Sequence, residues 1–127
     1  LSFFPPHHHN LIRMQLCMLL EGVISQRLIP RKGSFGRVPA VEMLLATPRV
    51  RELLSEGSTR ELPKAIEEGN EYFGSQTFNQ ALVKLIRGGG IAVDDALGAS
   101  DSPDELRLAL RGISKGSRAA AYDSGQY

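Results

Sequence analysis

The chain has 127 residues, of which 42% are apolar and 23% are charged, and its formal net charge at pH 7 is +1. This length and composition fit one ordinary globular domain and exclude disordered, collagen-like and membrane-spanning classes. The fifteen basic residues are scattered among fourteen acidic ones, so charge alone does not predict nucleic acid as a partner. The single cysteine, Cys17, excludes an internal disulfide and a zinc site built from several cysteines, and it fits a reducing cytoplasm.

The first predicted element is a long helix from about His8 to Ile24, after a lead-in that ends at Pro5-Pro6. Apolar residues recur at helical spacing, but charges interrupt the run too often for a membrane span, which needs about 20 largely apolar residues. The apolar stripe is wide, as in a helix that packs on a sheet, and includes Ile12, Met14, Leu16, Cys17, Met18, Leu19, Leu20 and Val23. Because Leu1 is not an initiator Met, we expect the sequence to begin inside a longer protein.

Two short strands are predicted next, at Gln26 to Arg31 and Arg37 to Leu45, joined by a loop that contains two glycines. Pro30 and Pro39 each lack the N–H that a central strand donates to its neighbour. We therefore place both strands at the margin of a sheet.

Helical signals begin at Thr47, a favoured N-cap, followed by Pro48 at the first helical position. Gly57 then stands where helices commonly end, so the pattern predicts a helix over Pro48 to Glu56.

Three more short helices are predicted, at Pro63 to Glu68, at Thr77 to the triple glycine that starts at Gly88, and at Ser102 to about Arg111. The Ser/Gly/Ala-rich tail to Tyr127 has no periodicity and is predicted to be disordered. The expected fold is α+β and mostly α-helical: one long N-terminal helix, a short two-stranded β segment and a bundle of four short helices.

The residues themselves predict no catalytic, cofactor-binding or metal-binding site. The consecutive His7, His8 and His9 point about 100° apart on a helix and do not chelate one ion. Neither glycine-rich loop, 33–36 or 88–90, is followed by the Lys-Ser/Thr of a phosphate-binding loop. Asp94-Asp95 is typical of charge at a helix start rather than of a catalytic carboxylate pair.

Several stretches nevertheless resemble a known family in both order and spacing, from Phe3 to about Leu110. They are Phe3-Phe4-Pro5-Pro6-His7, Arg13-Met14-Gln15-Leu16, Gly22-Val23-Ile24-Ser25-Gln26-Arg27-Leu28-Ile29-Pro30-Arg31, Gly36-Arg37-Val38-Pro39-Ala40-Val41-Glu42, Gln76-Thr77-Phe78-Asn79-Gln80-Ala81-Leu82 and Ala99-Ser100-Asp101-Ser102-Pro103-Asp104-Glu105-Leu106. They resemble the late part of the PilT-type twitching-motility ATPases, which retract type IV pili. Related assembly and secretion ATPases often carry paired cysteines after the strand at Gln26, where this chain has none, and this favours the retraction branch.

The predicted helix at Pro48 is similar to that family's retraction signature, Ala-Ile-Arg-Asn-Leu-Ile-Arg-Glu. The matching site residues are Val50, Arg51, Leu53, Leu54 and Glu56, whereas the signature differs at Arg49, Glu52 and Ser55. The three apolar residues form one stripe that anchors the helix, and we expect the two charged ones to reach a neighbour and transmit force. On that view, Arg51→Ala costs only about 0–1 kcal/mol of stability, as exposed ion pairs do.

The family's pattern is also broken at two other positions. Ser75 replaces a usual Met, and Ala92 replaces the usual Ser or Thr cap ahead of Asp94. Both changes predict weaker packing or capping.

The resemblance implies a hexameric ring of subunits with a PAS-like and a RecA-like ATPase domain, in the cytoplasm at the inner-membrane base of the pilus. Residues 1–46 would end the RecA-like domain, 47–112 would form a helical subdomain and 113–127 a disordered tail. The implied partners are other copies of the subunit and the pilus machinery, without nucleic acid or metal.

The family's phosphate-binding loop and magnesium-binding acid would lie before Leu1. ATP and Mg²⁺ are thus implied for the parent protein, and this chain alone is expected not to be an enzyme. The wide stripe on the first helix would then lack most of its sheet, which predicts exposed apolar surface and self-association. Two alternatives stay open: a free-standing helical interaction module of the bacterial cytoplasm, or a fragment of a pilus-assembly or type II secretion ATPase.

Overall fold

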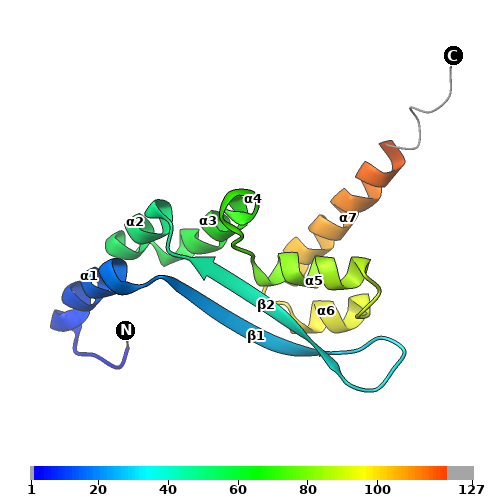
Figure 1. Ribbon diagram of the computed structural model, residues 1–127, viewed down its shortest axis with the longest axis horizontal. Coiled ribbons are helices and arrows are strands. Elements are labelled where there is room, and N and C mark those ends of the chain that lie inside the picture. Colours follow the sequence, from blue (N-terminus) through cyan, green and yellow to red (C-terminus); the bar gives the residue numbers. More distant parts are fainter. Residues whose placement is uncertain (1, 120–127) are drawn as a thin grey trace, which may run out of the picture. The chain divides into compact units, whose positions relative to one another are not determined.

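A computed structural model describes residues 2–119 (Figure 1). In chain order the elements are η1 (Pro6–His8), α1 (His9–Leu19), β1 (Gly22–Pro30), β2 (Arg37–Leu45), α2 (Pro48–Glu56), η2 (Thr59–Glu61), α3 (Leu62–Glu68), α4 (Asn70–Phe73), α5 (Phe78–Arg87), α6 (Val93–Ala99) and α7 (Pro103–Ala119). Most of the secondary structure is helical, and the strands form one two-stranded antiparallel sheet, so the predicted α+β, mostly α-helical fold class is confirmed.

Helix α1 is shorter than predicted. It ends at Leu19, and Leu20 is already extended with a ψ of 125°. The residues that follow belong to strand β1, because Val23 and Ile24 are β-branched and favour a pleated backbone over a helix. Gly22 allows a close approach at the start of this strand, where an added Cβ would lie 3.1 Å from the carbonyl oxygen of Leu44.

Strand β2 has the predicted bounds, and its outer edge is partly covered. The amide and carbonyl of Met43 exchange two 2.9 Å hydrogen bonds with those of Gln76, and the Gln76 side chain donates to the carbonyl of Val41 at 2.6 Å. The segment before α5 therefore extends the ladder of β2 by one bridge.

In the described residues six α-helices and the short 3-10 helix η2 follow the hairpin, where the sequence predicted four helices. At Gly69, φ is −78°, a value compatible with a helix, so this glycine does not end the helical region and α4 follows it. Helix α6 forms at Val93 without a side-chain cap, as the replacement at Ala92 predicted. Helix α7 continues to Ala119, past its predicted end, and the rest of the predicted disordered tail, 120–127, lies outside the described residues.

Ser75 is buried and fully engaged, although it replaces a larger residue of the family. Its hydroxyl donates to the carbonyl of Ile66 at 2.8 Å, and Asn70 donates to its carbonyl at 2.6 Å. A methyl group on Gly69 would lie 2.5 Å from the Ser75 Oγ. The small side chain thus fits the close approach between the end of α3 and the segment that follows α4, and the predicted weaker packing at this position stays a prediction.

The chain divides into two compact units. Unit 1 comprises 1–26 and 41–77, and unit 2 comprises 27–40 and the chain from Phe78 onward. Both strands of the hairpin pass from one unit into the other. These units cut across the predicted segments 1–46 and 47–112, whose assignment to domains of the family stays a prediction.

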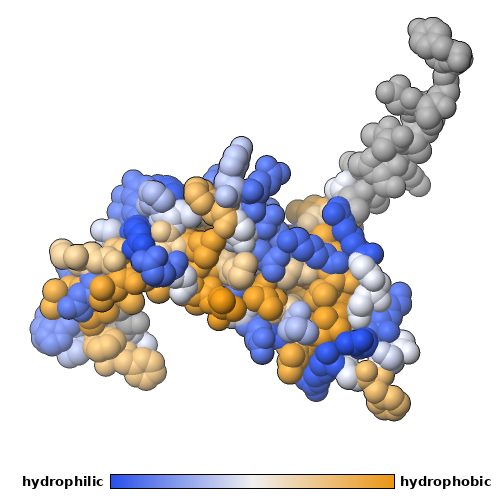
Figure 2. Space-filling view, in the orientation of Figure 1, coloured by the Kyte–Doolittle hydropathy of each residue, from blue (hydrophilic) through white to orange (hydrophobic). Residues whose placement is uncertain are grey.

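Each unit has its own buried residues. In unit 2 the hairpin and helices α5 to α7 enclose a core of Ile29, Ala40, Phe78, Ala81, Leu82, Ile91, Ala96 and Leu106. In unit 1 the buried apolar residues are Val50, Leu53 and Ile66, from α2 and α3. Helix α1 buries none of its side chains fully, and apolar side chains are visible on the surface of unit 1 in Figure 2.

Candidate functional site: the signature helix

Helix α2 has the bounds that the sequence predicted, because local signals fix both of its ends. The hydroxyl of Thr47 accepts a 3.3 Å hydrogen bond from the amide of Val50. At the other end Gly57 has a φ of +74°, and the amides of Gly57 and Ser58 donate to the carbonyls of Leu54 and Leu53. This pair of bonds is the Schellman motif, which satisfies the last carbonyls of a helix.

The predicted apolar stripe of α2 faces the inside of unit 1. Val50 and Leu53 are buried, with 2% and 1% of their surface exposed, and Leu54 is half-buried. Helix α2 packs against α1 and α3 in this unit. The stripe therefore anchors the helix, as its spacing indicated.

Arg51 lies differently from what the sequence led us to expect. Its side chain is only 31% exposed, and its Nε donates to the carbonyl of Ala46 at 3.1 Å. Its Nη1 donates to the carbonyl of Cys17 in the last turn of α1, and its Nη2 lies 3.5 Å from the Glu21 carboxylate. A group expected to reach a neighbour thus uses its donors within unit 1.

The bond to Cys17 has a counterpart in the opposite direction. The thiol of Cys17 donates to the carbonyl of Arg51 at 3.3 Å. The Cys17 carbonyl is among the last ones of α1, which have no partner inside the helix and attract positive charge. Arg51 therefore caps the C-terminal end of α1 and joins it to α2, an arrangement that we call the Arg51 brace.

The outer face of α2 is charged. The guanidinium of Arg49 is 2.7 Å from the Glu52 carboxylate and 3.0 Å from that of Glu61, with all three side chains more than half exposed. The hydrogen bond to Glu52 raises the pKa of Arg49 above its ordinary value. Glu56 is also exposed. From the sequence, Arg49 and Glu52 stood out only as departures from the signature, although an Arg and a Glu three residues apart on a helix indicate such a pair.

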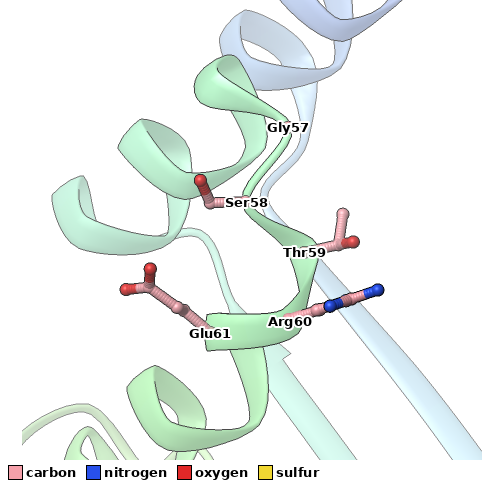
Figure 3. Close-up of a pocket in the computed structure, with 5 residues that line it drawn as sticks. All are labelled: Gly57, Ser58, Thr59, Arg60 and Glu61. Atoms are coloured by element: carbon pink, nitrogen blue, oxygen red, sulfur yellow. The ribbon is translucent and has the colours of Figure 1, made fainter.

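A hollow of about 270 Å³ follows α2 and is lined by the turn from Gly57 to Glu61 (Figure 3). Figure 3 shows the side chains of Ser58 and Glu61 on one side of this turn and those of Thr59 and Arg60 on the other. A ligand pocket needs polar groups that converge on one point. Because these side chains diverge, the hollow has the geometry of a surface turn rather than of a binding site.

The described residues hold no group of three or more potential metal ligands close enough to share an ion. The histidines at the start of the chain are engaged otherwise, since the His9 Nε2 lies 2.9 Å from the carbonyl of Phe4 and the rings of His7 and His8 contact each other at 4.1 Å between centroids. Among residues 2–119 no helix is both long and apolar enough to cross a bilayer.

The fold and the signature helix together define a class of protein: the chain is a relative of the PilT-type ATPases and matches their C-terminal region. The crystal structure of the pilus retraction motor PilT with bound ADP aligns with a TM-score of 0.69 at 36% identity, over 84% of this chain and 29% of that one. No family model matches the chain.

Two curated relatives agree with the structural match. The type IV pilus ATPase PilU of Pseudomonas aeruginosa is 36% identical over 111 residues, which are 87% of this chain and 29% of the relative. A twitching motility protein of Neisseria gonorrhoeae is 36% identical over 93 residues, 73% of this chain and 25% of the relative. The chain thus spans less than a third of the relatives' length.

Proposed function

We propose that the chain is the C-terminal part of a hexameric type IV pilus retraction motor, in which it contributes subunit packing and force transmission but not ATP cleavage. The observation that carries this proposal is the layout of helix α2. Val50 and Leu53 anchor the helix, the Arg51 brace ties it to α1, and its opposite face presents Arg49, Glu52 and Glu56 to solvent. A helix held rigidly at its base with a charged outer face suits the transfer of movement to a neighbour.

Cleavage of ATP belongs, on this proposal, to the rest of the parent protein. Phosphoryl transfer needs groups that hold the phosphates and Mg²⁺ in line. Neither glycine-rich loop of this sequence continues into the Lys-Ser/Thr of a phosphate-binding loop. The match to a PilT structure with bound ADP supports a nucleotide as a ligand of the parent, and Mg²⁺ is proposed because phosphoryl transfer requires it. The proposed location is the cytoplasmic face of the inner membrane, beside the pilus machinery.

The alternatives differ from this proposal in what they require of α1. A free-standing interaction module should cover its apolar residues, whereas in α1 the side chains of Met18 and Leu19 are 72% and 77% exposed. Such a face fits a helix whose packing partner lies in another part of a larger protein. It therefore favours a motor fragment, and the absence of cysteines after β1 favours the retraction branch over the secretion branch.

The test uses the full-length parent. We expect Glu56→Ala to leave ATP turnover within about twofold of the unchanged protein, because the exposed carboxylate contributes little to stability. Twitching on agar should nevertheless be lost, because the proposal assigns this carboxylate to force transmission. Arg51→Ala should abolish twitching as well, with a loss of stability that Glu56→Ala does not show. Glu68→Ala on α3, also an exposed carboxylate, is the matched control. Unchanged twitching in both variants would mean that α2 is only a structural cap.

A nucleotide titration tests the other half of the proposal. The purified chain should neither bind nor hydrolyse ATP, whereas the full-length parent should do both. Turnover by contaminant-free chain would overturn the assignment of cleavage to the missing part.

A further inference from the structure

The two compact units carry opposite net charge. Unit 1 has five basic and eight acidic residues, a net charge of −3, and unit 2 has ten basic and six acidic residues, a net charge of +4. The overall charge of +1 conceals this difference. Segregated positive charge is typical of a surface that meets a polyanion.

Part of the positive charge of unit 2 gathers at the tip of the hairpin. Three of the seven residues from 31 to 37 are basic, Arg31, Lys32 and Arg37, and all seven are exposed. At the apex, the Phe35 side chain is completely exposed to solvent. The turn needs its glycines, since Gly33 and Gly36 have φ values of +71° and +101°, which other residues rarely adopt.

The tip is held beside the turn that follows α5 by main-chain hydrogen bonds. The amide of Arg31 donates to the carbonyl of Gly36 at 3.0 Å, which closes the loop. The amide of Lys32 donates to the carbonyl of Gly90 at 2.9 Å, which fixes the loop beside the turn that follows α5. Figure 1 shows the β1–β2 loop and the α5–α6 turn at the same end of unit 2. Arg87, the exposed last residue of α5, lies just before that turn.

These four cations are not neutralised within the described part of the chain. No ion pair to Arg31, Lys32, Arg37 or Arg87 occurs among residues 2–119, whereas Arg27, earlier in β1, is paired with Asp101. The acidic side chains that follow the turn in sequence are Asp94 and Asp95, in the first turn of α6. Four cations against two carboxylates leave this end of unit 2 positive.

We propose that this basic tip, Arg31 to Arg37 with Arg87, binds the surface of an anionic phospholipid bilayer, with Phe35 placed among the headgroups. Binding of a peripheral protein to a bilayer grows with the apolar area that it buries and with its electrostatic attraction to anionic lipids, and a cluster of cations beside an exposed apolar side chain contributes to both. Single-stranded nucleic acid is recognised by several aromatic side chains along a basic groove. Among the described residues of unit 2, Phe35 is the one exposed large aromatic, and it stands on a projecting turn.

The first experiment places a reporter at the apex. The sequence has no tryptophan, so Phe35→Trp introduces a single one, and Tyr72→Trp introduces one at an exposed position of unit 1. With phosphatidylcholine vesicles that contain phosphatidylglycerol, the tryptophan emission of the Phe35→Trp variant should shift to the blue and resist acrylamide quenching. Neither change should occur with phosphatidylcholine alone, at high salt, or in the Tyr72→Trp variant. If the emission of the Phe35→Trp variant is indifferent to anionic lipid, the proposal is overturned.

The second experiment separates the tip from the exposed apolar face of α1, another surface of the described chain that would offer a bilayer apolar side chains. Each cation near an anionic membrane strengthens binding about fivefold, so Arg31→Gln with Lys32→Gln should weaken co-sedimentation with anionic vesicles about 30-fold. The matched control is Arg60→Gln with Lys64→Gln, two exposed cations of unit 1, which should change it less than about twofold. Circular dichroism verifies that both variants fold.

Two results, one from this comparison and one from a binding assay with an oligonucleotide, would contradict the proposal. If both double variants bind alike, the contact runs through α1 and not through the tip. If a single-stranded oligonucleotide binds the chain more tightly than anionic vesicles do at the same salt concentration, the partner is a nucleic acid and the assignment to lipid is wrong.

Discussion

Replacing Arg51 by Ala should loosen α2 from the end of α1. The change removes hydrogen bonds from a charged donor to the carbonyls of Ala46 and Cys17 and the 3.5 Å contact with Glu21. The Glu21 side chain is 88% exposed, so that contact adds little. Bonds from charged donors contribute about 1.5–3 kcal/mol each, and partial access of water to the site reduces the sum to about 2–3 kcal/mol. This loss of stability exceeds the cost of about 0–1 kcal/mol that the sequence predicted for an exposed Arg51.

Urea unfolding followed by circular dichroism measures the effect, because a lower midpoint at constant slope reports lost stability. Arg49→Ala is the control: it removes the same residue type from the same helix, but the side chain is 53% exposed, and the midpoint should stay unchanged. Arg51→Lys should recover part of the loss, since an ammonium lacks the planar fork that serves two acceptors. Equal midpoints for Arg51→Ala and Arg49→Ala would refute the brace.

Leu53→Ala should cost about 2–5 kcal/mol in the same assay, because it opens a cavity at a fully buried site. Gly57→Ala should lower the free energy of unfolding by roughly 1–2 kcal/mol, since a left-handed backbone disfavours a Cβ. The new methyl group would also lie 3.2 Å from the Arg13 Cζ. A urea midpoint equal to that of the unchanged chain would contradict this reasoning. Because Met18 and Leu19 are exposed on α1, Met18→Lys with Leu19→Gln should shift the chain toward monomer in light scattering; a chain that is strictly monomeric before substitution rules out the predicted self-association.

Helix α2 was predictable to the residue because its signals are local. The signals come from Thr47, Pro48 and Gly57, and each acts on the backbone within a few positions of itself. Their effect can therefore be predicted without knowledge of the fold. The burial of Val50 and Leu53 follows from their spacing on the helix in the same way. The end of α1 could not be placed from the sequence, because only Glu21 and Gly22 separate its apolar residues from Val23 and Ile24, and so short an interruption fits either a continued helix or a new strand.

The orientation of Arg51 was beyond sequence reasoning for a different reason. Two of its partners, Cys17 and Glu21, lie at least 30 positions earlier in the chain. One of these acceptors is a main-chain carbonyl, and every residue has one, so the residue type gives no indication of this bond. Spacing along α2 correctly put Arg51 off the centre of the apolar stripe, but it could not reveal that the end of another helix lies there. The role of the signature residues in retraction stays a prediction.

The passage of both strands through both units means that neither unit is a continuous stretch of chain, because the polypeptide crosses between them at 26/27, 40/41 and 77/78. A single cut at the hairpin tip would give two fragments, each of which carries pieces of both units. The core of unit 2 would be divided, since Ile29 would leave with the first fragment and Leu82 with the second. A nicked chain should therefore stay together as a non-covalent complex, and the two fragments mixed in solution should restore each other's fold. Truncation of the chain from either end, by contrast, removes residues from both units or leaves one unit incomplete.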